Sequence, residues 1–314
     1  MELLEVNRDE YLSVVNAPYH MFNSMQFNEA NKENADRIHY FLFKDGKHRL
    51  GLIAGLIDKT LISPFSAPFG GFSFVKDDIR IKYLESALPI LESWALANKI
   101  TKLQFTLPPL FYHDTFIAKE INSLFTANYS INNIDLNYHF RTIFLNDNYE
   151  NLIWYSAKKQ LNKARKNNFT FKKCTTDSER QSAFEVIKIN RNKKGYPLRM
   201  SLSDIYKTDH IIKKDFFLVF SDDDIPVGSA IIFHVSNKIV QVVYWGDNVE
   251  YSNLSVMNYL SFSVFEYYKR VGIQIVDIGP STENSIPNHG LCDFKESIGC
   301  EIIPKFTFSK NLNS

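Results

Sequence analysis

The chain has 314 residues, 45% hydrophobic and 14% aromatic, a composition that excludes a disordered polymer and provides for two domains with substantial cores. A formal net charge of +1 excludes a global attraction to nucleic acid or to an anionic membrane, so electrostatic binding requires a local patch. Three cysteines without a CxxC pair argue against a disulfide framework and against a structural zinc site. We therefore expect a reducing compartment and no metal.

The first half predicts a strand, a capped helix, a β-hairpin, a second helix and further strands. Asn7, followed three residues later by Glu10, is typical of a helix start. The expected elements are strand 3–6, a helix with apolar positions 11–15, paired strands 51–57 and 60–63, a turn-rich loop 66–72, a helix 79–95, strand 103–107 and a closing strand 139–145.

The second half repeats this order. Thr176 and Glu179 form a predicted capping box before a helix with apolar positions 184–189. The other expected elements are strand 169–174, a hairpin of strands 227–234 and 239–245, a loop 246–253, a helix 256–268, strand 273–278 and a closing strand 305–308. The offset between matching elements is roughly 170 residues, which is too long for a solenoid and typical of a duplicated domain.

Strands that alternate with helices predict an α/β (α+β) fold, and the hairpins make each sheet mixed rather than purely parallel. We expect one domain over residues 1–148 and a second over residues 149–314. The N-terminal segment carries acidic residues where an export signal needs a basic flank, and no apolar stretch approaches the roughly 18–20 residues that span a bilayer. The expected location is the cytoplasm, without a transmembrane segment.

A basic linker helix is expected over residues 151–168. This helix and the two residues beyond it in the next strand carry seven cations and no acid: Lys158, Lys159, Lys163, Arg165, Lys166, Lys172 and Lys173. Such a run can hold tRNA or an anionic membrane surface through phosphate contacts without base specificity. A solvated helix face is the alternative, and it is the commoner outcome for such a run.

In the order and spacing of five segments, the second half resembles the tandem-GNAT acyltransferases of the Fem type. This family comprises the peptidoglycan aminoacyltransferases and Fem-like acetyltransferases. These segments are the basic helix 158–166, the strand end 244–246, the helix 253–272, the strand 277–279 and the segment 293–295. The resemblance covers residues 151–304, whereas the first half agrees mainly in architecture, best at Pro68-Phe69-Gly70-Gly71. It implies two tandem GNAT-like domains, acyl transfer to an amine bound in the cleft between them, and a link to the bacterial cell envelope.

The resemblance leaves two acyl donors open. Donor-binding residues implied by it are Tyr244, Trp245, Gly246, Asn253 and Phe294. Enzymes that use acetyl-CoA usually have glycines in the loop before the long helix, where backbone amides hold the pyrophosphate. Here that loop, 246–253, contains two acids and one glycine. Fem-type members also lack the glycine-rich loop, and the best-known of them take the acyl group from an aminoacyl-tRNA. Acyl-CoA is ranked first. The alternative is a Fem-type aminoacyltransferase that uses aminoacyl-tRNA and acts on a peptidoglycan precursor.

Lys295 and Asp277 are the catalytic candidates. Lys295 resembles the lysine of the family's Phe-Lys motif, which implies a role in stabilising the donor's carbonyl oxygen or a nearby phosphate; a solvated helix lysine is the alternative. Asp277 lies in an apolar strand, where a carboxylate needs a partner, and it either accepts the amine proton or caps the following turn. His289 is a further titratable group in this region, and Asp293 is the expected cap of the helix that carries Lys295.

Arg191, Tyr196 and Arg199 form a basic and aromatic cluster that the resemblance implies in acceptor binding. Gly70 and Gly71 are the first-half candidates, because a phosphate can approach glycine amides before a helix; a tight turn is the alternative. The expected acceptor is a small-molecule, nucleotide-linked or lipid-linked amine. A non-catalytic protein that binds RNA or a membrane surface remains the opposing hypothesis.

Overall fold

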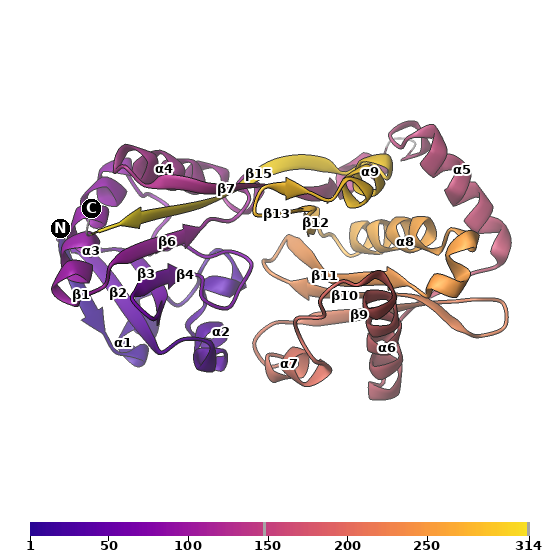
Figure 1. The fold of residues 1–314 in the computed structure, drawn as a ribbon, viewed down its shortest axis with the longest axis horizontal. Coiled ribbons are helices and arrows are strands. Elements are labelled where there is room, and N and C mark those ends of the chain that lie inside the picture. The colour runs from indigo at the N-terminus through magenta and orange to yellow at the C-terminus, as the bar shows by residue number, and fades with distance from the viewer. Residues whose placement is uncertain (147–148, 313–314) are drawn as a thin grey trace. The chain divides into compact units, whose positions relative to one another are not determined.

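The computed structural model describes residues 1–146 and 149–312, and the chain forms two compact units (Figure 1). Unit 1 comprises Met1–Leu136, Thr282–Ile286 and Ile303–Ser314, and unit 2 comprises Asn137–Ser281 and Pro287–Ile302. Both units combine a mixed sheet with flanking helices, so the predicted α/β class is confirmed. Within the described residues, no helix has the length and apolar character needed to cross a membrane.

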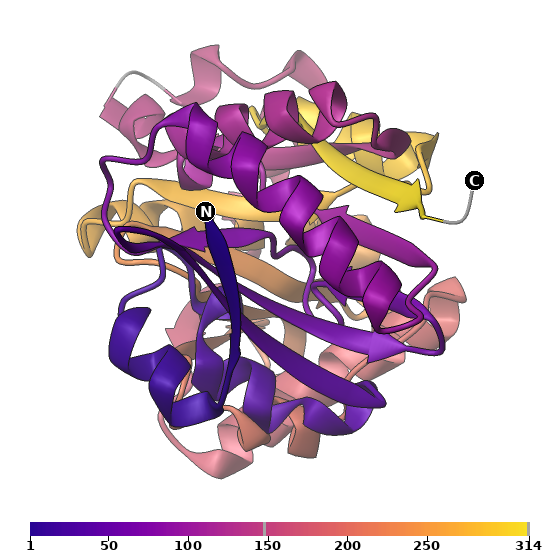
Figure 2. The same cartoon turned by 90° about the vertical axis from the view of Figure 1, so that its left-hand side faces the viewer.

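Unit 1 is built around one sheet with the strand order β1-β2-β3-β4-β6-β15, in which β5 also pairs with β3 (Figure 2). Its core is strongly aromatic, and Phe41 and Phe72 are almost completely buried. The elements are β1 (Glu2–Val6), α1 (Arg8–Val14), α2 (Met25–Ala30), β2 (Arg37–Asp45), β3 (Lys47–Ile57), β4 (Thr60–Ser63), β5 (Phe72–Phe74), α3 (Ile81–Ala97), β6 (Lys102–Thr106), α4 (Asp114–Thr126) and the start of β7 (Ser130–Arg141).

Unit 2 has the strand order β7-β12-β11-β10-β9-β8. Only the β11–β12 pair is parallel among these, and the other neighbours are antiparallel. The elements are α5 (Tyr155–Ala164), β8 (Thr170–Lys173), α6 (Asp177–Lys194), α7 (Leu202–Lys207), β9 (Lys214–Phe220), β10 (Pro226–His234), β11 (Ile239–Asp247), α8 (Val256–Arg270), β12 (Ile275–Pro280), α9 (His289–Ser297) and the start of β15 (Glu301–Asn311).

Several local predictions are confirmed. The Asn7 side chain caps α1 by accepting from two backbone N–H groups, and Thr176 with Glu179 forms the capping box of α6. The predicted hairpins are β3–β4 and β10–β11. The basic linker helix forms as α5, and Asn168 ends the following turn in the left-handed conformation. These features depend on neighbours in the sequence, which is why local patterns identify them.

The predictions for the two closing strands, 139–145 and 305–308, were wrong, because each strand pairs with strands of the other half of the sequence. Residues 137–141 of β7 pair with β12 in unit 2, and residues 142–146, expected as strand, form a 3₁₀ helix. In turn, Thr307 to Asn311 of β15 pair with β6 in unit 1. The two long strands thus contribute to both units, and each unit is completed by a strand from the other half. An alternating pattern shows which face of a strand is buried but does not identify its neighbour.

The chain therefore divides differently from the expected domains 1–148 and 149–314. The first unit gives up residues 137–146 and gains two C-terminal segments, because β7 and β15 each pass from one unit into the other. The expected boundary at residue 148 and the end of the second domain at residue 314 lie outside the described residues.

A buried carboxyl group stands out in unit 1. Glu120 of α4 is 1% exposed, and its Oε1 accepts a hydrogen bond of 2.8 Å from the Phe72 backbone N–H, while Oε2 has no hydrogen-bond partner among the described residues. Burial raises the pKa of Glu120 well above its usual range. The folded protein therefore favours the neutral form of Glu120. The stabilisation that this form provides is complete at a pH below the usual glutamate pKa, and it is lost as the pH rises through the raised pKa of the folded protein.

We predict that Glu120→Gln removes this pH dependence. The amide matches the neutral acid in shape, so the variant has wild-type stability at about pH 4 and is more stable by at least about 1 kcal/mol at about pH 8, one pKa unit being worth about 1.4 kcal/mol. Urea unfolding at both pH values measures the difference, with the exposed Glu85→Gln on α3 as the control. A variant less stable than wild type at pH 8 would show that Glu120 is ionised in the folded protein.

Candidate functional site

The parallel strands β11 and β12 in unit 2 pair over a short distance and then separate. Their register contains three pairs, and the last joins Gln241 to Asp277. On its other side β11 has a bulge, since Ile231 of β10 pairs with Tyr244 while Ile232 pairs with Val242. A bulge turns a strand away from its former direction and is often found next to functional sites. The strand ends beyond Gln241 and Asp277 are therefore the first place to look for a site.

Asp277 lies at this point of separation and is fully buried. Its Oδ1 accepts hydrogen bonds from Asn137 Nδ2 at 2.8 Å and from the Gly279 backbone N–H at 2.9 Å, and its Oδ2 accepts from Gln241 Nε2 at 2.8 Å. The partner that a carboxylate in this strand requires is thus a pair of amides, one on β7 and one on β11. Asp277 joins three adjacent strands and accepts a hydrogen bond from Gly279 in the turn that follows it.

Lys295 of α9 binds the end of the same strand. Its ammonium group donates to the backbone carbonyls of Ile278, Gly279 and Pro280 at 3.1, 2.9 and 3.1 Å, and the side chain is 4% exposed. Gly279 has φ +70°, a conformation that glycine adopts readily, and the β7–β12 register shifts at this position. Three successive carbonyls thereby meet one cation, whose three N–H groups are all used.

Burial lowers the pKa of Lys295 to about 8, although the nearby Cys300, Asp277 and Cys292 oppose the shift and Arg191 adds to it. The three carbonyl contacts require the protonated form, because only an ammonium has three N–H donors. Its positive charge is also 5.2 Å from the centre of the Tyr138 ring. In this geometry Lys295 holds the end of β12 in place, and contact with a substrate oxygen requires the release of one carbonyl.

Arg191 near the end of α6 forms a second feature. Its guanidinium lies over the rings of Tyr244, at 5.3 Å, and Tyr196, at 5.7 Å, and no hydrogen bond or ion pair joins it to the described residues. Burial lowers the pKa of Arg191, with the two tyrosines opposing the shift. A half-buried guanidinium without an acceptor is suited to binding an anion.

Two further contacts hold this Arg191 cluster in place. Tyr244 Oη accepts a 3.1 Å hydrogen bond from the Met200 backbone N–H. Asn288 Nδ2 donates to Tyr196 Oη at 3.2 Å, while its Oδ1 accepts from Leu291 N and so caps α9. The Arg191 cluster is thereby joined to the helix that carries Lys295.

The expected donor-binding residues have different surroundings. Trp245 and Phe294 are in contact, edge to face, with ring centres 6.1 Å apart. At Gly246 a Cβ would lie 2.7 Å from Asn190 of α6, so this glycine permits the close approach of the helix to β11. Asn253 is exposed in the short helix before α8.

Among the expected acceptor residues, Arg191 and Tyr196 lie together, whereas Gly70 and Gly71 belong to unit 1. The Gly70 amide donates to Thr106 O and the Gly71 amide to Ser63 Oγ, so neither is available to a phosphate. Arg199 is exposed.

The expectation for the helix cap was wrong. Asn288 caps α9, and Asp293 is exposed within the helix. His289 is also exposed, at the first position of the same helix.

Sequence reasoning missed Asn137, Gln241 and Asn288. Gln241 carried a usable signal, because it is the one amide in the apolar run 239–245 and occupies a buried strand. Asn288 likewise precedes α9 at the position where helix caps occur. Asn137 gave no such signal, since its strand contains several polar residues.

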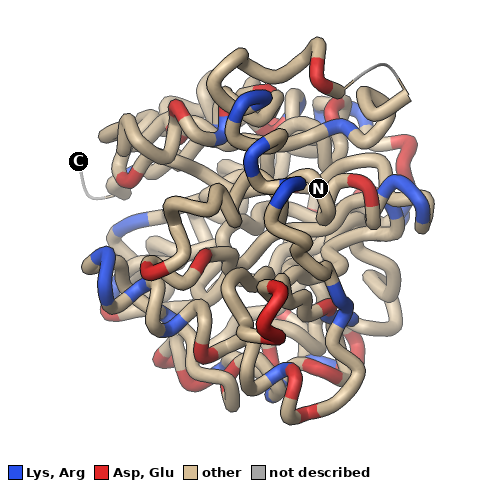
Figure 3. Tube along the Cα trace, turned by 90° about the vertical axis from the view of Figure 1, so that its right-hand side faces the viewer, with Lys and Arg blue, Asp and Glu red and all other residues tan. Residues whose placement is uncertain are grey.

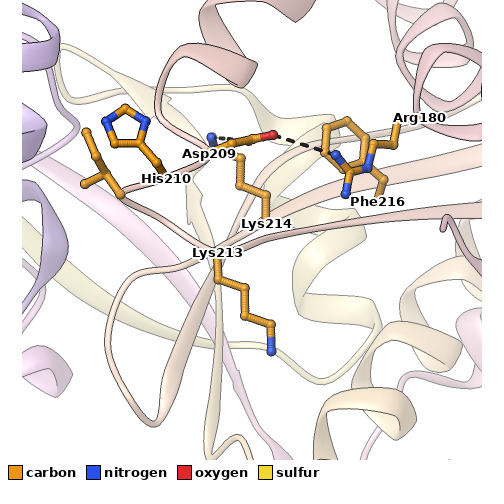
Figure 4. A pocket seen from close by; sticks show the side chains of 7 residues that line it. Arg180, Asp209, His210, Lys213, Lys214 and Phe216 are labelled. Carbon is orange, nitrogen blue, oxygen red and sulfur yellow. Dashed lines mark hydrogen bonds and ion pairs between the residues drawn. The ribbon is translucent and has the colours of Figure 1, made fainter. Parts of the chain in front are cut away.

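A separate polar pocket of about 420 Å³ lies between α6 and the start of β9 (Figure 4). Asp209 pairs there with Lys214 at 2.7 Å and with Arg180 at 3.7 Å. Two of its cations are thus compensated within the protein, which makes it a weaker anion site than Arg191. No three acidic, His or Cys side chains gather as a metal site among the residues described.

No protein-family model matches this sequence, and no curated protein matches it. The fold is nevertheless similar to solved structures. FemX has 13% identity and a TM-score of 0.70, with 100% of this chain and 98% of FemX covered. L-PGS from Bacillus licheniformis has 11% identity and a TM-score of 0.62, with 99% and 93% covered. A tandem GNAT protein from the clavulanic acid biosynthesis pathway has 9% identity and a TM-score of 0.54, with 99% and 98% covered. The chain thus has a Fem-like, GNAT-type fold.

We predict that Lys295→Met destabilises the protein by about 3–5 kcal/mol, because it leaves the strand-end carbonyls without their charged donor. The urea midpoint measures this loss. Lys188→Met, an exposed substitution on α6, should change stability by less than about 0.5 kcal/mol. A Lys295→Met protein as stable as wild type would instead indicate an ammonium that is free to act on substrate.

Proposed function

We propose that this chain is an N-acyltransferase that moves an acyl group from acyl-CoA to the amine of an acceptor bearing a phosphate. The GNAT-type fold supports the reaction class. The observation that carries the proposal is Arg191, a half-buried guanidinium that lies over two tyrosine rings and has no acceptor of its own among the described residues. The phosphate of the acceptor supplies that missing partner.

Two features of unit 2 support acyl-CoA as the donor. Beyond Gln241 and Asp277 the parallel strands separate, and an extended chain with amide groups, such as the pantetheine arm of CoA, can take the place of a strand between them. Helix α8 has no side-chain cap, because the Ser255 hydroxyl donates to Gln160 instead. Its first N–H groups are thus suited to the CoA pyrophosphate.

The reaction needs little covalent chemistry from the protein. The amine nitrogen attacks the thioester carbonyl carbon, the C–N bond forms as the C–S bond breaks, and the proton released by the amine protonates the departing thiolate. Alignment of the two reactants supplies much of the acceleration. In this account Asp277 and Lys295 are positioning residues, since they fix the strand ends between which the donor lies.

Aminoacyl-tRNA is the second candidate donor. FemX and L-PGS are more similar to this chain, with TM-scores of 0.70 and 0.62, than the tandem GNAT protein at 0.54. The loop before α8 also contains Asp247 and Glu250, which pair with Lys194 and Lys193. An aminoacyl ester undergoes the same attack by an amine, so the acceptor side of the proposal is unchanged.

We predict that Arg191→Met raises the KM for glucosamine 6-phosphate about 10-fold to 100-fold, the range expected for one lost charge-assisted contact, while activity on unphosphorylated glucosamine stays within about twofold. Release of free CoA thiol from acetyl-CoA measures both reactions. Lys188→Met on the same helix is the control and should match wild type with both amines.

A parallel assay follows transfer of a radiolabelled aminoacyl group from aminoacyl-tRNA to the same amines, because this ester donor releases tRNA and no thiol, and it distinguishes the donors. Equal losses with both amines would show that Arg191 does not bind phosphate. Transfer with neither donor to either amine, in a protein that binds RNA or vesicles, would favour the non-catalytic alternative.

A further inference from the structure

Helix α5 has two sharply different faces. Ala157, Leu161 and Ala164 are buried, on a helix that packs against α8 within unit 2. At the helical spacing that defines the opposite face, Tyr155, Lys159 and Lys163 follow one another at intervals of four residues, and Lys166 continues the row into the next turn. Figure 3 shows the side of the molecule that is on the right in Figure 1, where α5 lies, with Lys and Arg positions in blue.

The lysines of the outward face are not compensated within the described chain. Glu150 pairs with Lys158 at 3.3 Å and also with Arg165, which stacks on Phe262. These two cations thus belong to the packing of the helix. Lys159, Lys163 and Lys166 are exposed and form no ion pair with the described acidic residues.

Large apolar side chains are exposed at the start of the same helix and just before it. Tyr155 is 83% exposed, Trp154 47% and Leu152 42%. Ile143, 61% exposed, lies in a 3₁₀ helix that contacts the turn before Leu152. Exposed apolar groups of this size, gathered in one region, mark an interaction surface.

We propose that the α5 surface, defined by Leu152, Trp154, Tyr155, Lys159, Lys163 and Lys166, docks the protein on an anionic phospholipid bilayer. Lysines attract acidic headgroups, while Trp and Tyr rings favour the boundary between headgroups and acyl chains. The exposed aliphatic side chains, Ile143 and Leu152, favour a bilayer over RNA. Their burial among acyl chains stabilises the bound state, whereas they form no contact with phosphates and do not stack on bases.

The test measures binding to phosphatidylcholine vesicles with and without an equimolar share of phosphatidylglycerol. We expect wild-type protein to bind the anionic vesicles and not the neutral ones. Each lysine contributes about fivefold to binding, so Lys159→Gln/Lys163→Gln/Lys166→Gln should weaken it about 100-fold. The matched control, Lys32→Gln/Lys44→Gln/Lys47→Gln, makes the same charge change at exposed positions of unit 1 and should bind as wild type does.

A second variant, Ile143→Ser/Leu152→Ser, removes only exposed aliphatic side chains and so separates a lipid surface from RNA. We expect it to weaken vesicle binding at least tenfold and to leave binding to single-stranded poly(U) unchanged. The proposal is overturned if the two triple variants bind anionic vesicles equally, or if the α5 changes reduce poly(U) binding and not vesicle binding. Circular dichroism and the urea midpoint confirm that every variant is folded. Since no acyl transfer is measured, the result does not depend on the proposed function.

Discussion

One buried carboxylate constrains unit 2. Asp277 lies at the point where β11 and β12 stop pairing, and an isolated charge there would be prohibitively costly. Amide donors from Asn137 and Gln241, with the Gly279 N–H, make its burial possible and join three strands. The separation of β11 from β12 then leaves strand-end carbonyls, and Lys295 satisfies three of them. The two charged groups thus bind the strand ends at the point where the pairing of β11 with β12 stops.

These contacts bear on the roles expected for Asp277 and Lys295, the two catalytic candidates of the sequence analysis. Both bind groups of the protein itself, and in the proposed reaction they position the strand ends. The anion-binding group of the proposed reaction is Arg191 on α6, whose guanidinium lies over the rings of Tyr196 and Tyr244. Asn288 connects the two regions, since it caps α9 and also binds Tyr196. Rigid support for one unsatisfied cation is what selective recognition of an anion requires.

Local features could be predicted from the sequence, and long-range partners could not. The capping box at Thr176 and the duplicated hairpins follow from nearest neighbours in the chain. The need of Asp277 for a partner was also evident, because an acid in an apolar strand requires one. Its actual partners were not, since Asn137 is remote in sequence and one polar residue among many in β7. The sequence also did not predict that β7 pairs in unit 2 and β15 in unit 1. These strand partners are remote in sequence, and an alternating pattern does not identify them. Gly70 and Gly71 show the converse error, in which a plausible anion motif proves to be tight packing.

The most direct test is a crystal structure with a bisubstrate compound, CoA joined through an acetyl linker to the amine of glucosamine 6-phosphate. The account predicts the pantetheine arm between β11 and β12, the sugar phosphate on the Arg191 guanidinium, and Lys295 still bound to the carbonyls of residues 278–280. A compound bound elsewhere in the chain, or an Arg191 side chain without phosphate while Lys295 turns to the ligand, would contradict it.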